Sequence, residues 1–172
     1  MIIVLLGYMG VGKSAVGQQL SKIIAYSFID LDDYIEEQEG KSISEIFKTK
    51  GEIYFRKKEH QYLKEILAKY DKVVLSLGGG TPCYANNMEV LKNKKVISIY
   101  LQLSPKELSN RLFSIKEHRP LLREIKSSEK LTEFIAIHLF ERQAFYNQAK
   151  HCIVTSHLSI QEITELIVKR LY

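Results

Sequence analysis

The chain has 172 residues, of which 45% are hydrophobic and 26% are charged. This length fits one compact domain, and the composition is near the average of globular proteins. Collagen-like, intrinsically disordered and disulfide-scaffold classes are therefore excluded. The chain has 25 Lys and Arg residues and 20 Asp and Glu residues, which gives a net charge of +5. This charge is compatible with binding either a nucleic acid or a small anionic ligand.

Five short runs of apolar and β-branched residues predict β-strands. They are Ile2–Leu6, Ser27–Ile29, Val73–Leu77, Val96–Leu101 and Cys152–Thr155. Each run is nearly continuous in apolar residues, which is typical of a parallel strand that is covered on both faces.

Between these runs, apolar residues recur at helical spacing. The predicted helices are Lys13–Ile24, a short helix from the capping box at Ser42 to about Gly51, Gly51–Tyr70, Ala85–Asn93, Pro105–Phe113, Glu129–Lys150 and Ile160–Leu171. The alternation of strands and helices predicts one α/β domain over residues 1–172, a parallel sheet with helices on both faces.

The N-terminal apolar run, Met1–Leu6, lacks the basic start and the small-residue cleavage site of a signal peptide. No run approaches 18 consecutive apolar residues, so we expect no membrane span. The sequence therefore predicts a cytoplasmic protein.

The segment Gly7–Ser14, which reads GYMGVGKS, matches the phosphate-binding pattern GxxxxGK[ST] between a predicted strand and a predicted helix. Its glycines allow backbone amides to wrap around phosphate oxygens, and the positive end of the helix faces the same anion. In this pattern Lys13 bridges the β- and γ-phosphates, and Ser14 is a ligand of Mg²⁺. The alternative is a glycine turn that only starts a helix. The expected contacts with ATP come from Gly10, Val11, Gly12, Lys13, Ser14 and Ala15.

Two acidic residues, Asp30 and Asp32, follow the second predicted strand. Along an extended segment, residues two apart point the same way, so both carboxylates are expected to face the phosphate loop. Such a pair suits Mg²⁺ and an acceptor hydroxyl group. The alternative is a solvated acidic turn that caps a helix over Asp33–Glu39.

A second glycine cluster, Gly78, Gly79 and Gly80, follows the third predicted strand. Three adjacent glycines permit a ligand to approach the backbone closely at the carboxyl edge of the sheet. The alternative is a loose turn between a strand and a helix.

Three arginines stand out by their context. Arg56 follows Phe55, Arg119 precedes a proline, and Arg142 lies in a long predicted helix. The segment of about residues 114–128, which contains Arg119, has no clear helical face and predicts a lid that closes over phosphates. For each arginine the alternative is a solvated surface position.

Taken together, these motifs resemble the shikimate kinase family in order and spacing over nearly the whole chain. The matching segments are Gly7–Ser14, Asp30–Asp32, Phe55–Arg56, Gly78–Gly80, Arg119–Leu122 and Arg142. The resemblance implies ATP-dependent phosphorylation of the 3-hydroxyl of shikimate, in the biosynthesis of aromatic amino acids. It also implies a three-layer P-loop NTPase fold of the nucleoside-monophosphate-kinase type, with parallel strand order 2-3-1-4-5.

The resemblance further implies a role for each matching residue. Lys13, Asp32 and Arg119 are expected to be catalytic, with Asp32 at the acceptor hydroxyl and Arg119 reaching the phosphoryl group from the lid. Asp30 is expected to organise Mg²⁺ through its water shell, and Arg111 lies near the position of the family's adenine-stacking arginine. The expected substrate-binding residues are Asp32, Arg56, Gly78, Gly79, Gly80 and Arg142, with Glu59 orienting Arg56.

Two other kinds of function remain open at this stage. Another small-metabolite kinase of the same fold, such as a gluconate kinase or an adenylate kinase, shares the loop and the lid but should lack the combination of Asp30, Asp32, Arg56 and the glycine cluster. A non-catalytic nucleotide-binding or nucleic-acid-binding module would explain the basic charge, but no motif of aromatic and basic residues supports it. We therefore expect a monomer that binds ATP and shikimate and neither nucleic acid nor membrane.

Overall fold

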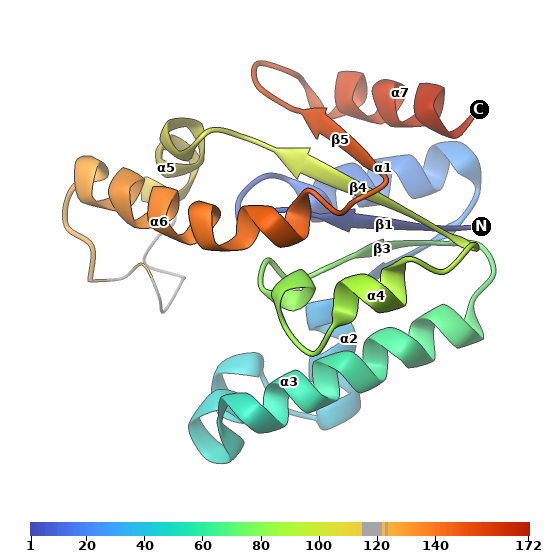
Figure 1. Ribbon diagram of the computed structural model, residues 1–172, viewed down its shortest axis with the longest axis horizontal. Helices are drawn as coiled ribbons and strands as arrows, with labels where there is room; N and C mark the ends of the chain where they lie inside the picture. Colours follow the sequence, from blue (N-terminus) through green and yellow to red (C-terminus); the bar gives the residue numbers. More distant parts are fainter. Residues whose placement is uncertain (115–121, 123) are drawn as a thin grey trace.

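The computed structural model describes residues 1–114, 122 and 124–172 (Figure 1). Within these residues, five strands pair in parallel in the order β2-β3-β1-β4-β5. The strands are β1 (Ile2–Leu6), β2 (Ser27–Asp30), β3 (Val73–Ser76), β4 (Val96–Gln102) and β5 (His151–Val154). The expected sheet and strand order are thus confirmed, and the strand bounds differ from expectation by one residue at most.

The helices of the described residues surround this sheet. They are α1 (Lys13–Ile24), α2 (Leu31–Glu39), α3 (Ile43–Lys69), the short 3₁₀ helix η1 (Thr81–Cys83), α4 (Asn87–Leu91), α5 (Pro105–Phe113), α6 (Ser128–Tyr146) and α7 (Ile160–Leu171). Ser42, Ser104 and Ser159 begin α3, α5 and α7 with capping boxes, each closed by a glutamate three residues on. Among the described residues, no helix is both long and apolar enough to cross a bilayer.

Strand β1 lies at the centre of the sheet and is fully buried. Its side chains alternate between two apolar cores, as the period of a strand requires. Ile2, Val4 and Leu6 pack on the face that α3 and α4 cover, whereas Ile3 and Leu5 pack on the face of α1, α5 and α7 (Figure 1). This burial on both faces explains the continuous apolar run of β1 and confirms the three-layer architecture.

Two predicted helices are shorter than expected. Of the predicted helix Ala85–Asn93 only the five-residue α4 forms, because Ala85 and Asn86 have left-handed backbones with φ of 51° and 55°. Helix α6 ends at Tyr146 rather than at Lys150. The backbone N–H of Lys150 donates to Oγ of Ser98 at 3.0 Å, which draws the chain out of the helix and into β5 beside β4.

Helix α3 bends at Gly51, where two separate helices were expected to meet. Gly51 has φ 79° and ψ 172°, a non-helical backbone that only glycine adopts readily. Residues on both sides of the bend therefore approach the end of α2.

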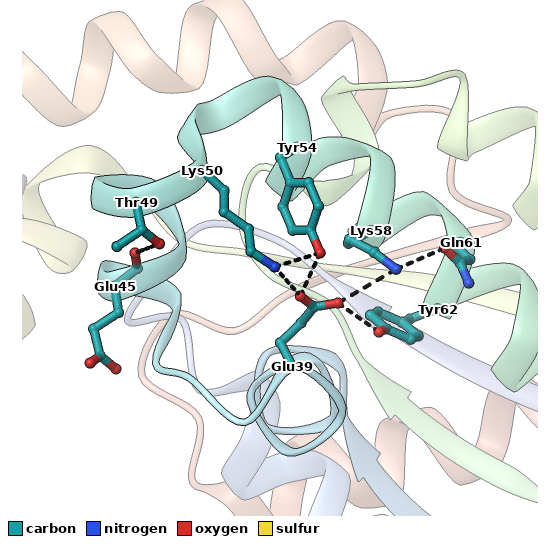
Figure 2. Close-up of polar contacts among 8 residues, drawn as sticks. All are labelled: Glu39, Glu45, Thr49, Lys50, Tyr54, Lys58, Gln61 and Tyr62. Carbon is teal, nitrogen blue, oxygen red and sulfur yellow. Dashed lines mark hydrogen bonds and ion pairs between the residues drawn. The ribbon is translucent and has the colours of Figure 1, made fainter.

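The carboxylate of Glu39, the last residue of α2, holds both sides of this bend (Figure 2). Its Oε2 accepts hydrogen bonds from Oη of Tyr54 at 2.7 Å and from Nζ of Lys50 at 3.3 Å. Its Oε1 accepts from Oη of Tyr62 at 2.8 Å and lies 3.6 Å from Nζ of Lys58. These hydrogen bonds, with that of Tyr54 the strongest influence, lower the pKa of Glu39 to about 2.

We expect Glu39→Gln to lower the free energy of unfolding at pH 7 by about 1.5–3 kcal/mol, because hydrogen bonds to a charged group are lost. The pKa of Glu39 is lower in the folded than in the unfolded chain, so its ionised form stabilises the fold above the unfolded pKa. This contribution fades as the pH falls from about 5 towards 2. Urea unfolding of both proteins between pH 7 and pH 3 should therefore show a shrinking difference.

The matched control for this variant is Glu37→Gln, which changes an exposed residue of the same helix. Its free energy of unfolding should stay within about 0.5 kcal/mol of the unchanged protein. A destabilisation by Glu39→Gln that is the same at pH 3 as at pH 7 would contradict the assignment.

Candidate active site

The phosphate loop leaves the centre of the sheet after β1 and ends at the start of α1. Gly7, Gly10 and Gly12 have φ of 145°, 80° and 105°, which side chains rarely allow. At Gly7 space is also lacking, since a Cβ atom would lie 2.5 Å from the carbonyl oxygen of Leu101 on β4. The glycines therefore let the loop turn tightly against the sheet with its backbone available to a ligand.

The side chain of Lys13, the first residue of α1, curls back over this loop. Its Nζ donates to the carbonyl oxygens of Gly7 at 2.9 Å and Tyr8 at 3.1 Å, and the residue is buried. The N-terminus of α1 and the ammonium group both contribute positive potential at the same place. The loop is thus arranged to bind an anion such as a phosphate.

Asp30 ends β2 and is also the N-cap of α2, so the expectation that Asp30 and Asp32 lie along an extended segment is wrong. Helix α2 already begins at Leu31, and Oδ1 of Asp30 accepts a hydrogen bond from the backbone N–H of Asp32 at 3.1 Å. Its Oδ2 accepts from Oγ of Ser14 at 2.6 Å. The same carboxylate therefore caps a helix with one oxygen and reaches the phosphate loop with the other.

Asp32 lies in the first turn of α2 and is half-buried. Its burial is the main reason that its pKa is raised to about 6. The negative charges of Asp30 and Glu59 also raise the pKa of Asp32, whereas the positive charge of Lys13 lowers it. Near neutral pH the group is mostly ionised, yet it accepts a proton more readily than an ordinary aspartate does.

The register of the sheet brings a third loop to this place. Leu5 on β1 and Asp30 on β2 both pair with Ser76 on β3, so the loops after these three strands leave the sheet at one level. Two residues further on, a Cβ atom at Gly78 would lie 2.8 Å from Oδ1 of Asp32. The absence of a side chain at Gly78 therefore leaves the space that the Asp32 carboxylate occupies.

One cavity of about 250 Å³ joins the three loops. Its lining includes most of the residues that the sequence motifs indicate, namely Gly10, Gly12, Lys13, Ser14, Ala15, Asp30, Asp32, Gly78 and Gly79. Val11 and Gly80 lie in the same loops but do not line it. Positive and negative side chains thus face one space from two sides.

A larger groove of about 490 Å³ lies beside β4, α5 and α6. Its lining includes the exposed Phe140 and Val154 but neither acidic nor basic side chains. It contains none of the residues that the motifs indicate, so we place the chemistry in the smaller and more polar cavity.

Two arginines lie against the glycine loop. Nη1 of Arg56, on α3, donates to Oε2 of Glu59 at 2.8 Å, and Nη2 of Arg56 would lie 3.0 Å from a Cβ atom at Gly80. Nη1 of Arg142, on α6, would lie 3.6 Å from a Cβ atom at Gly79. The loop backbone and two guanidinium groups therefore lie next to one another, as the recognition of a small anion requires.

The other two arginines are placed differently. Nη1 of Arg111, on α5, donates to the carbonyl oxygen of Val11 at 3.2 Å, so Arg111 contacts the phosphate loop. Like Arg56 and Arg142, it does not line the cavity. Arg119 lies outside the described residues, as does most of the predicted lid over residues 114–128. Within that segment, Leu122 is buried among apolar residues of the core.

Two polar side chains that the sequence motifs did not indicate hold the glycine loop. Oη of Tyr146 donates to the carbonyl oxygen of Gly79 at 2.6 Å, and Oγ1 of Thr81 donates to Oε1 of Glu59 at 2.6 Å. Tyr146 follows Arg142 by four residues on one helix, a spacing that could have linked the two. Thr81 carries no such signal, because its partner lies on a different helix.

The family model for shikimate kinase matches residues 9–172 of the chain. Among curated proteins, the shikimate kinase of Flavobacterium johnsoniae is 47% identical over 166 residues, which cover 96% of each protein. The shikimate kinase of Flavobacterium psychrophilum is 46% identical over 170 residues, which cover 99% of this chain and 98% of that protein.

Solved structures show the same relationship. A shikimate kinase from Bacteroides thetaiotaomicron matches with a TM-score of 0.91 and 36% identity, over 99% of this chain and 98% of that chain. A shikimate kinase from Acinetobacter baumannii in complex with shikimate matches with a TM-score of 0.85 and 31% identity, over 99% of this chain and 92% of the other.

Proposed function

The chain belongs to the shikimate kinase family, and we infer that it transfers the γ-phosphoryl group of ATP to the 3-hydroxyl of shikimate. The observation that carries this inference is the single cavity that joins the phosphate loop, Asp32 and the glycine loop. The first loop suits a nucleotide, and the glycine loop with its arginines suits a small anion that carries hydroxyl groups. The reaction belongs to the biosynthesis of aromatic amino acids.

We propose that the phosphates of ATP lie in the phosphate loop and at the start of α1. The backbone amides of this segment and the Ser14 hydroxyl surround the phosphates. Lys13 exchanges its two carbonyl partners for the β- and γ-phosphate oxygens, a short movement for a flexible side chain. The proposed ATP-binding residues are Gly10, Val11, Gly12, Lys13, Ser14, Ala15, Arg111 and Arg119.

The residues at the phosphate loop fit a magnesium ion. The Ser14 hydroxyl and the Asp30 carboxylate are oxygen ligands joined at 2.6 Å, at the edge of the cavity. Among the described residues, no group of three or more His, Cys, Asp or Glu could hold a metal by itself. Mg²⁺ retains water and is shared with substrate phosphates, so we propose Ser14 as a direct ligand and Asp30 as a ligand through water. When bound, the ion supplies charge neutralisation on the phosphates.

We propose that Asp32 accepts the proton of the 3-hydroxyl as the oxygen of that group bonds to the γ-phosphorus and the bond to the leaving ADP breaks. In a loose transition state the attacking alcohol keeps its proton until late, so a carboxylate is a sufficient base. The raised pKa of Asp32 suits this role. Lys13 and Arg119 are proposed to stabilise the negative charge of the transferred group.

We propose that Arg56 and Arg142 bind the carboxylate and hydroxyl groups of shikimate, together with Asp32 and the backbone of Gly78–Gly80. A guanidinium group offers two parallel N–H donors to a carboxylate, which an ammonium group cannot do. The place of these two side chains beside the glycine loop supports the proposal, since Nη1 of Arg142 and Nη2 of Arg56 lie 3.6 and 3.0 Å from where Cβ atoms of Gly79 and Gly80 would stand.

We also propose the domain organisation, the lid, the oligomeric state and the location of the protein that the sequence predicts. Residues 1–172 are proposed to act as one kinase domain whose lid, at about residues 114–128, brings Arg119 to the phosphates. The proposal also includes a monomeric enzyme of the cytoplasm that binds neither nucleic acid nor membrane. Arg111 is proposed to lie near the adenine, which its contact with Val11 supports.

The purified protein with ATP and Mg²⁺ should release ADP in proportion to added shikimate. Gluconate and AMP, the acceptors of the nearest alternative kinases, should leave ADP release at its background rate. A coupled assay for ADP measures all three acceptors. Release that follows gluconate or AMP, with none that depends on shikimate, would overturn the function.

Lys13→Ala and Asp32→Asn should each lower kcat by about 100-fold or more, because one removes charge from the phosphates and the other removes the proton acceptor. Steady-state kinetics measure the effect, and thermal unfolding checks that both variants are folded. Lys22→Ala, at the exposed end of the same helix as Lys13, is the control and should keep full turnover. Unchanged kcat in Lys13→Ala or Asp32→Asn would refute the corresponding role.

Two glycine variants should separate turnover from substrate binding. A Cβ atom at Gly78 meets Asp32, so Gly78→Ala should lower kcat about 10- to 100-fold through misplacement of the base. A Cβ atom at Gly80 meets Arg56, so Gly80→Ala should mainly raise the KM for shikimate, by about tenfold for a weakened charged hydrogen bond. If the two variants gave the same pattern, the separate roles of the glycines would be wrong.

A further inference from the structure

We propose that Tyr84 is a positioning residue that holds the Arg56 guanidinium group in the orientation in which it binds shikimate. The proposal rests on the proposed role of Arg56 as a ligand of the substrate. Tyr84 lies against the Arg56 guanidinium group and, like Arg56, does not line the cavity between the phosphate loop and the glycine loop. The role assigned to it is to hold Arg56.

The guanidinium group of Arg56 lies over the ring of Tyr84, with Cζ 3.9 Å from the ring centroid. This distance is well within the range of a cation–π contact. The centroid of the Phe55 ring is farther from Cζ, at 5.1 Å. Phe55 precedes Arg56 in the chain, so this proximity follows from the sequence. Of the described aromatic residues, Tyr84 therefore makes the closest contact with the guanidinium group.

The edge of the guanidinium group is held by a different kind of contact. Glu59 binds Nη1 at 2.8 Å, and the exposed Glu52 lies 3.4 Å from Nε. An ion pair at one edge fixes a nitrogen atom but leaves the plane able to turn about that contact. A ring packed against the guanidinium carbon restricts this rotation, so Glu59 and Tyr84 together limit the positions that the Arg56 guanidinium group can take.

Tyr84 is itself attached to the glycine loop. Its carbonyl oxygen accepts a hydrogen bond from the backbone N–H of Asn87 at 3.0 Å, and the preceding Cys83 N–H donates to Gly80 at 2.9 Å. Thr81, in the same turn, donates to Glu59. The segment 81–84, which directly follows the glycine loop, is thus linked to Arg56 in two ways, through the Thr81 contact with Glu59 and through the Tyr84 ring.

The hydroxyl group of Tyr84 has no part in this proposal, which gives the test a close control. Tyr84→Ala removes the ring, and Tyr84→Leu keeps apolar volume without a π face. We expect both to raise the KM for shikimate about fivefold, or about 1 kcal/mol at 1.4 kcal/mol per tenfold, with kcat and the KM for ATP within twofold. Tyr84→Phe keeps the ring and should restore the KM for shikimate.

Combination with Arg56→Ala distinguishes action through Arg56 from an independent effect. Arg56→Ala alone should raise the KM for shikimate more than Tyr84→Ala does, and the double variant should equal Arg56→Ala within twofold, because the ring then has nothing to hold. Additive effects in the double variant would overturn the inference, as would a Tyr84→Leu or a Tyr84→Ala enzyme with unchanged KM. Thermal unfolding of each variant identifies loss of fold.

The same measurements separate this inference from the proposed function. If Arg56→Ala left the KM for shikimate unchanged, the proposed role of Arg56 would fail, and the inference would fail with it. If Arg56→Ala raised that KM while Tyr84→Ala did not, the role of Arg56 would stand and only the positioning role of Tyr84 would be wrong.

Discussion

Parallel pairing of β2, β3 and β1 is the constraint on which the site depends. Strands that run in one direction end at one edge of the sheet, and the shared partner Ser76 sets Leu5 and Asp30 at the same level. The phosphate loop, the acidic start of α2 and the glycine loop therefore open into one cavity. None of the three could act alone, because phosphoryl transfer requires donor and acceptor to meet in line.

Buried polar contacts then fix the glycine loop at one side of the cavity. Glu59 accepts from both Arg56 and Thr81, and Tyr146 holds the carbonyl oxygen of Gly79. Within the described residues, every buried side-chain nitrogen and oxygen has a hydrogen-bond partner. A fully satisfied network of this kind is rigid, since any displacement leaves a buried polar group unpaired. Helix α3, which carries Glu59 and Arg56, is held in turn by Glu39, whose carboxylate binds residues on both sides of the Gly51 bend (Figure 2).

The sequence predicted much of the site because several of its motifs are local. The phosphate loop needs a strand, glycines and a helix in immediate succession, and that order is visible in the chain. The geometry at Asp30 is not visible in the sequence, since its dual contact with the helix backbone and with Ser14 arises only because α2 begins directly after β2. The sequence gives no signal for Tyr84, because its cation–π contact joins residues that no sequence spacing connects.

The amino-acid sequence by itself determined the alternation of strands and helices, the phosphate loop and, through its ordered motifs, the family. Apolar periodicity, capping serines and glycines are properties of short segments, so they can be recognised without any long-range contact. Only the tertiary structure decided where α4 begins and α6 ends, which oxygen of Asp30 meets Ser14, and which groups surround Arg56. Those outcomes depend on sheet register and on side chains from distant segments, and such contacts exist only after the core has packed.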